Sequence, residues 1–147
     1  MALRLDLKPY EGFLINGALI RNGARKTDFL IETQCKFLRE SEVVKESEAD
    51  TPAKMLCVTL QMLYLADDPA EADDLLTRQA TALLRARPAL APFLVAIQDE
   101  IAERRYHKAL KRGRDLVRQE RLLLDAEETS HVVSTGGPVG SKLEILD

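Results

Sequence analysis

Residues 13–20, FLINGALI, place two short apolar runs on either side of Asn16 and Gly17. Asn-Gly is the strongest short-range hairpin signal, because both residues tolerate the positive φ angles of a two-residue turn. Upstream, residues 3–8 alternate apolar and charged side chains with the period of a half-buried strand. Pro9 then ends the hydrogen-bonding ladder of that strand. These patterns predict antiparallel strands at the amino-terminal end of the chain.

Two further runs extend the predicted sheet. Asn22-Gly23 repeats the turn signal ahead of residues 27–32, TDFLIE, and residues 35–37 indicate one more strand. A sheet of about 40 residues does not bury both of its faces alone. We therefore expect it to pack on helices or on a second subunit.

The segment that follows predicts helices. Thr51-Pro52 provides a cap and a proline at the first helical position. Residues 52–66 are apolar around nearly the whole circumference of a helix, which is typical of a central, buried helix. Asp68 caps a second helix that runs to about Arg85, since Pro88 stops it.

Two more helices are expected at residues 92–103 and 104–124, the first opened by Pro92. The predicted fold is therefore α+β, with a small antiparallel N-terminal β-sheet followed by a four-helix C-terminal portion. We expect one domain over residues 1–124, with a β part at 1–45 and a helical part at 51–124. Residues 125–147 are turn-rich around Gly136-Gly137 and predict a disordered tail.

Composition narrows the class of protein. The chain has 147 residues, 46% of them hydrophobic, and a net charge of −3, which argues against coating nucleic acid or membrane by bulk charge. Arg4 and Asp6 interrupt the stretch that a signal peptide would need, and no window approaches the ~20 apolar residues of a membrane span. Two cysteines, Cys35 and Cys57, build no disulfide framework. We expect a cytoplasmic protein without a membrane partner.

The sequence contains no convincing motif of a catalytic site. His107 and His131 lack a nucleophile–base–orienter set, and no glycine-rich phosphate loop is present. Both histidines are read as solvated polar side chains, and Cys35 and Cys57 as reduced core thiols without metal-ligand spacing. We predict that the protein is not an enzyme and holds no cofactor or metal. A hydrolase that uses an acidic cluster is a third alternative. The same carboxylates are also interpreted as a solvated connector between the strands and the helices. The cluster consists of Glu42, Glu46, Glu48 and Asp50.

Charge is distributed unevenly along the chain. Residues 41–74 hold two basic and nine acidic groups, whereas residues 75–124 hold eleven basic and five acidic groups. Because salt screens charge over ~8 Å, a partner responds to local patches more than to the total. An anionic ligand is therefore compatible with a local cationic patch.

Two cationic sets are candidates for binding RNA phosphates. One lies on or beside the turns of the sheet, and the other lies on the last helix, opposite an apolar face that contains Ala109, Leu110 and Gly113. The alternative interpretation is a solvated surface for the helix and charged turns and edges for the sheet. The candidates are Arg21, Arg25, Lys26, Lys36 and Arg39 in the sheet, and Arg104, Arg105, Lys108, Lys111 and Arg112 in the helix.

Four stretches carry a family resemblance: residues 1–23, MALRLDLKPYEGFLINGALIRNG; 29–43, FLIETQCKFLRESEV; 47–54, SEADTPAK; and 60–69, LQMLYLADDP. In this order they resemble the flagellum biosynthesis repressor family FlbT over roughly residues 1–124. The resemblance implies a post-transcriptional regulator that acts on the 5′ untranslated leader of flagellin mRNA, lowers translation and promotes decay of the message. A companion protein, FlaF, is implied in the same system. No catalytic residues are carried over.

A looser likeness links the strands and residues 37–40, FLRE, to the small carbon storage regulators, which also bind mRNA leaders. It motivates the hypothesis that Arg39 and Arg21 read RNA at the sheet edge. The predicted function is thus an RNA-binding repressor of flagellin synthesis. The alternative is a protein–protein adaptor or flagellin chaperone, with flagellin or FlaF as its partner, and self-association is left open.

Overall fold

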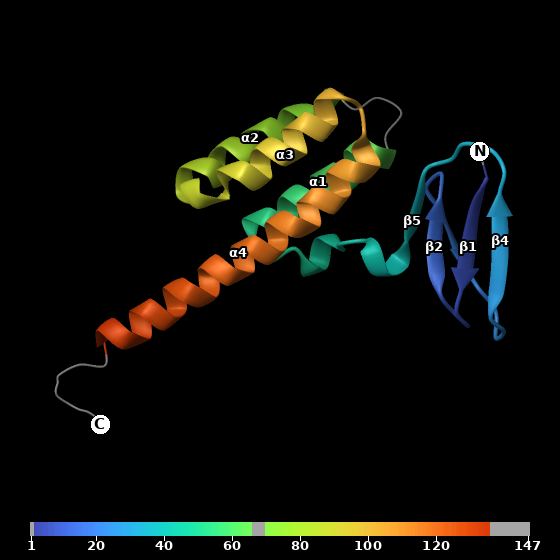
Figure 1. Ribbon diagram of the computed structural model, residues 1–147, viewed down its shortest axis with the longest axis horizontal. Coiled ribbons are helices and arrows are strands. Elements are labelled where there is room, and N and C mark those ends of the chain that lie inside the picture. Colours follow the sequence, from blue (N-terminus) through green and yellow to red (C-terminus); the bar gives the residue numbers. More distant parts are fainter. Residues whose placement is uncertain (1, 66–69, 136–147) are drawn as a thin grey trace.

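The computed structural model describes residues 2–65 and 70–135, and it confirms the predicted α+β class (Figure 1). Its strands form two small antiparallel sheets, β1–β4 and β3–β2–β5, in place of the one sheet expected. The strands are β1 (Leu3–Leu7), β2 (Gly12–Ile15), β3 (Ala18–Arg21), β4 (Thr27–Ile31) and β5 (Phe37–Arg39).

The two Asn-Gly pairs behave differently. Asn16 and Gly17 have φ angles of 49° and 85° and join β2 to β3, which confirms the predicted hairpin. Asn22-Gly23 does not join β3 to β4 in one ladder, because β4 pairs with β1 instead. The side-chain amide of Asn22 donates to the backbone oxygens of Lys8 and Arg25 at 2.8 and 2.9 Å. Long-range strand pairing therefore overrides the second local signal.

Strands β2 and β5 of the second sheet are covered on both faces, whereas β3 is exposed along its length. On one face the ring of Phe13 lies 5.9 Å from that of Phe29 and 5.7 Å from that of Phe37, in a small core with Leu5 and Leu7. On the other face the paired residues Leu14 and Leu38 contact the helical core. The expectation that the sheet packs on helices is thus confirmed for this sheet, while β1–β4 covers its opposite face.

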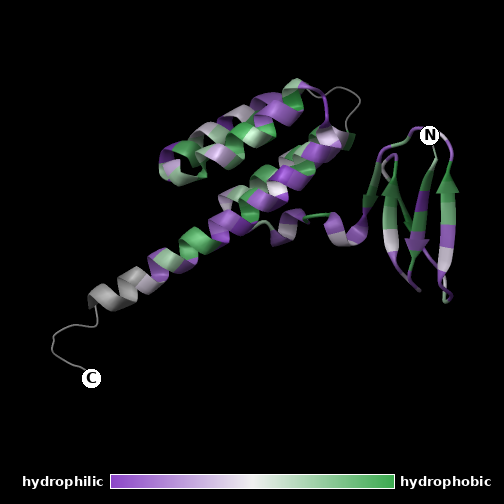
Figure 2. Cartoon of the chain, viewed as in Figure 1, coloured by the Kyte–Doolittle hydropathy of each residue, from purple (hydrophilic) through white to green (hydrophobic). Residues whose placement is uncertain are grey.

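Four helices follow, as predicted (Figure 1). α1 packs against α2 and α4, and α3 packs against α4. Figure 2 shows hydrophobic residues along all four helices, and the buried ones form one core cluster. Short 3₁₀ turns η1 (Glu40–Glu42) and η2 (Glu46–Glu48) connect the sheet to the helices, and η3 (Pro88–Leu90) leads into α3. The helices are α1 (Pro52–Leu65), α2 (Ala70–Ala86), α3 (Ala91–Ala102) and α4 (Tyr106–Thr135).

The end of α4 differs from the prediction. The helix does not stop near Leu124 but continues to Thr135, and it projects beyond the other helices (Figure 1). No glycine or proline lies between Leu124 and Gly136, so nothing in the backbone chemistry ends the helix in that stretch. Residues 136–147, the rest of the predicted tail, lie outside the described residues.

Helix α1 is central but not buried all round. Leu56, Leu60 and Leu63 are buried against the neighbouring helices, whereas Met55 and Met62 are about half exposed, at 51% and 49%. The expectation of burial around nearly the whole circumference is therefore wrong for one stripe, because only the faces toward α2, α4 and the connector are covered. None of the helices within the described ranges has the length and apolar character needed to cross a bilayer.

Polar contacts join the β part to α1. The hydroxyl of Tyr64 accepts a hydrogen bond from the backbone N–H of Phe37 at 2.7 Å, and the buried amide of Gln61 pairs with the backbone of Val44. At the start of α1, the carboxylate of Glu120, 2% exposed, accepts from the backbone N–H of Ala53 at 3.0 Å. These contacts place β5, α1 and α4 around one another.

Candidate nucleic-acid interface

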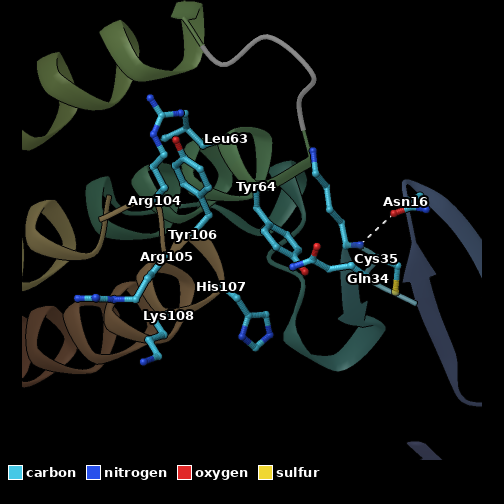
Figure 3. A pocket seen from close by; sticks show the side chains of 11 residues that line it. Asn16, Gln34, Cys35, Leu63, Tyr64, Arg104, Arg105, Tyr106, His107 and Lys108 are labelled. Atoms are coloured by element: carbon cyan, nitrogen blue, oxygen red, sulfur yellow. Dashed lines mark hydrogen bonds between the residues drawn. The ribbon is translucent and has the colours of Figure 1, made fainter. Parts of the chain in front are cut away.

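A pocket of about 830 Å³ lies between β5, the end of α1 and the start of α4 (Figure 3). Its lining, which lies wholly within the described part of the chain, contains basic, amide and aromatic side chains and no Asp or Glu. The lining residues are Asn16, Gln34, Cys35, Lys36, Leu63, Tyr64, Arg104, Arg105, Tyr106, His107 and Lys108. A concave site with this lining favours an anionic ligand.

A sharp reversal between α3 and α4 forms one wall of the pocket. Arg104 has a left-handed φ of 58°, and its backbone N–H donates to the carbonyl of Ile101 at 2.9 Å. The N–H of Arg105 donates to the carbonyl of Glu100 at 2.8 Å, and α4 begins at Tyr106. The positive end of the α4 dipole therefore adds to the local cationic charge.

Four of the ten predicted cations meet at this pocket, and they come from both predicted sets. Lys36 comes from the β part, and Arg104, Arg105 and Lys108 come from the start of α4. Figure 3 shows Arg105 and Lys108 extending from the α4 side, with Asn16 on the opposite side near the strands. The fold thus joins two sets that are far apart in the sequence.

The cations near α4 differ in their partners. Glu100, on α3, accepts from Nε of Arg105 at 2.7 Å and from Nε of Arg112 at 3.3 Å. The hydrogen bond from Arg105 is the main cause that holds the pKa of Glu100 below its usual range. Arg104 and Lys108 have no ion-pair partner among the residues that the structure describes. These two are the cations best placed for a ligand.

The two arginines proposed to read RNA at the sheet edge have carboxylate partners. Arg21 contacts Glu40 at 2.8 Å, and this hydrogen bond is the main cause that lowers the pKa of Glu40. Arg39 contacts Glu11 at 3.0 Å. An RNA phosphate would have to compete with both carboxylates, so these contacts do not favour the sheet-edge hypothesis.

The remaining predicted cations lie outside the pocket lining. Arg25 and Lys26 are exposed in the turn before β4, and Lys111 is exposed one turn along α4 from Lys108. On the opposite face of α4, Ala109, Leu110 and Gly113 are buried, which confirms the predicted apolar face.

Residues that the sequence interpretation did not assign to a site also line the pocket. His107 is exposed, as expected of a solvated side chain, and its ring lies 5.8 Å from that of Tyr64. Partial burial of the imidazole is the main cause that lowers its pKa. The contiguous residues 104–108, RRYHK, were a usable signal, whereas Tyr64 was hidden within an apolar helical run. The side chain of His131 lies outside the described residues.

The two thiols differ in environment. Cys35 is partly exposed and lines the pocket, whereas Cys57 is buried between α1 and α4. Desolvation raises the pKa of the Cys57 thiol to about 12. Both cysteines are free, and only Cys57 is a fully buried core thiol of the kind expected.

The acidic connector does not form a cation site within the described ranges. Glu42 faces Arg114 at 3.7 Å and accepts from the backbone N–H of Arg39 at 3.0 Å, while Asp50 contacts Lys54 at 3.0 Å. These carboxylates therefore lie against separate basic partners, which does not favour the hydrolase alternative.

The family model and the similar proteins all indicate one family. The family model described as "Flagellar protein FlbT" matches residues 3–124. The chain is 33% identical over 124 residues to the probable flagellum biosynthesis repressor protein FlbT of Rhodopseudomonas palustris (strain TIE-1), covering 84% of this chain and 98% of that protein. It is 32% identical over 147 residues to the flagellum biosynthesis repressor protein FlbT of Caulobacter vibrioides (strain ATCC 19089 / CIP 103742 / CB 15), covering 95% and 100%. No solved structure matches the chain significantly.

Proposed function

The chain belongs to the FlbT family of flagellar proteins, and from this premise we propose that it represses flagellin synthesis by binding the 5′ untranslated leader of flagellin mRNA in the cytoplasm. Bound leader would be withheld from translation and become available for decay. The protein catalyses no reaction in this proposal, so RNA bound to the pure protein stays intact.

The pocket at the start of α4 is the observation that carries the proposal. A protein of net charge −3 gathers Lys36, Arg104, Arg105 and Lys108 around a hollow whose described lining has no carboxylate. Phosphate contacts supply most of the sequence-independent affinity of proteins for nucleic acid. The pocket therefore favours RNA over a neutral or cationic partner.

Salt dependence provides a quantitative expectation. Each phosphate contact to single-stranded nucleic acid contributes a slope of about −0.7 to log K against log salt. Two contacts, from Arg104 and Lys108, would give a slope of about −1.4, and raising the salt from about 50 to 200 mM would weaken binding roughly sevenfold.

A gel-shift titration with flagellin leader RNA and a length-matched control RNA, at two salt concentrations, tests the proposal. Lys108→Glu should weaken binding of the leader at least tenfold at low salt and make the salt slope shallower. The matched control is Arg121→Glu, which makes the same change in net charge on α4, outside the pocket and beside Asp125. Equal effects of the two variants, or equal binding of both RNAs, would contradict the proposal.

A protein–protein adaptor or flagellin chaperone is the second candidate. The stripe on α1 formed by Met55 and Met62, which lie two turns apart and are about half exposed, favours it, because flexible thioether side chains suit adaptable protein contacts. Binding at this stripe would depend little on salt. Met55→Ser with Met62→Ser should leave leader binding unchanged under the RNA proposal and abolish flagellar regulation under the adaptor alternative.

A further inference from the structure

Arg104 stands at a backbone position that favours glycine. Its φ of 58° is left-handed, where a side chain is sterically disfavoured, yet the residue carries one of the longest side chains. The position is demanded by the fold: the N–H of Arg104 bonds to Ile101 and that of Arg105 bonds to Glu100, which ends α3 and lets α4 start at once. Glycine would make the same turn without strain.

The side chain of Arg104 is not used to stabilise the described fold. The neighbouring Arg105 donates to Glu100 at 2.7 Å, whereas Arg104 has no ion pair within the described ranges and is exposed. Arg104 lines the acid-free pocket and also a smaller adjoining hollow of about 340 Å³ that includes Asp73, and Figure 3 shows its side chain beside Tyr106 and Leu63. Strain alone does not mark a site, because exposed Tyr10 also has a left-handed φ, of 61°; Arg104 differs from Tyr10 in that it lines the pocket.

We propose that Arg104 anchors an RNA phosphate in this pocket and that the nucleotide it holds comes from an unpaired stretch of the leader. This inference rests on the proposed function and adds the anchoring residue and the form of the RNA. A guanidinium binds a phosphate through two parallel N–H groups. Single-stranded RNA turns its bases outward, and Tyr106, which is partly buried against the helical core, lines the pocket where such a base would lie.

The size of the pocket favours an unstacked nucleotide over a stacked RNA helix. A duplex presents its phosphates on a stiff, convex surface, and proteins that bind it contact phosphates over many base pairs. Here the cations without ion pairs, Arg104 and Lys108, border a hollow of about 830 Å³, which is the scale of a small-molecule site. One unstacked nucleotide with its phosphate suits such a hollow better than a duplex does.

Arg104→Gly tests the anchoring role because strain and function predict opposite effects of this one change. The variant should melt at a higher temperature than the parent protein and bind a single-stranded leader oligonucleotide at least tenfold more weakly in fluorescence anisotropy. Arg104→Lys keeps the charge but loses the paired N–H groups, and should bind with intermediate affinity. Tyr10→Gly is the matched control: Tyr10 also has a left-handed φ, 61°, and is 63% exposed outside the pocket. It should melt higher and bind normally.

Binding of single-stranded and of double-stranded leader RNA by the same protein tests which form of RNA the pocket holds. The parent protein should bind the single strand at least tenfold more tightly than the same strand annealed to its complement. Equal affinity for the duplex, or unchanged binding by Arg104→Gly, would overturn this inference and leave the proposed function in place. Competition by micromolar nucleoside monophosphates would show a small-molecule nucleotide site and also overturn it. Failure of the parent protein to bind the leader in any form would contradict the proposed function and this inference together.

Discussion

Replacing Gly113 with alanine should destabilise the protein, although the same change at an open helical position is stabilising. Gly113 lies at the crossing of α4 and α1, where an added Cβ would stand 2.9 Å from Cδ1 of Leu60 and 3.0 Å from Sγ of Cys57. Favourable contacts between such atoms lie at about 3.5–4.0 Å. Leu60 and Cys57 are 1% and 3% exposed, so neither has solvent to move into.

Two opposing effects set the magnitude. Glycine to alanine within a helix gains about 1 kcal/mol from the lower backbone entropy of the unfolded chain. Forcing an extra methyl group into a packed core costs about 1–3 kcal/mol. The net expectation for Gly113→Ala is a loss of about 1 kcal/mol of unfolding free energy, or about 2–4 °C in melting temperature for a chain of this size.

Urea unfolding followed by far-ultraviolet circular dichroism measures this change, since the helices dominate the signal. Leu60→Ala alone should cost about 2–5 kcal/mol by leaving a cavity in the core. In that background Gly113→Ala should become neutral or stabilising, because the closest opposing atom has been removed. A Gly113→Ala variant about 1 kcal/mol more stable than the parent protein would refute the close approach of α1 and α4.

Two further predictions concern the pocket. Native protein should react with a thiol reagent at Cys35 only, since the pKa of buried Cys57 is about 12. An anionic reagent should react with Cys35 faster than its cationic analogue, and bound leader RNA should protect Cys35 from both. Mass spectrometry before and after denaturation counts the modified thiols. Burial lowers the pKa of His107 in the free protein, and a neighbouring RNA phosphate would raise it again. The leader should therefore bind more tightly as pH falls from about 7.5 to 5.5, and anisotropy titrations should show a weaker pH dependence for His107→Gln; affinity independent of pH in the parent protein would contradict this coupling.

Turns and helix ends could be predicted from the sequence where they depend only on neighbouring residues. Asn16-Gly17 forms its turn because both residues accept positive φ whatever surrounds them. The start of α1 followed from the cap and proline at residues 51–52, and the end of α2 from Pro88, whereas Asp68, the predicted cap of α2, lies outside the described residues. The end of α4 was placed too early because residues 125–147 were interpreted together as a turn-rich tail, although no glycine or proline lies between Leu124 and Gly136.

The pairing of strands and the partners of cations depended on distance in space. Asn22-Gly23 has the same chemistry as the first turn, but β4 pairs with β1, which brings the ring of Phe29 to 5.9 Å from that of Phe13 and partly buries Ile31. Arg21 and Arg39 are indistinguishable from Arg104 as residues in a sequence. The fold places Glu40 and Glu11 beside the first two.

The amino-acid order alone thus determined the strand and helix content and the positions of the basic residues, because backbone preference and hydrophobic period act over a few neighbouring residues. Tertiary structure alone decided which guanidinium and ammonium groups have carboxylate partners and which border a shared hollow. Coulombic contacts act through space over a few ångströms, and residues as far apart as Lys36 and Lys108 come within that range only after the chain has folded.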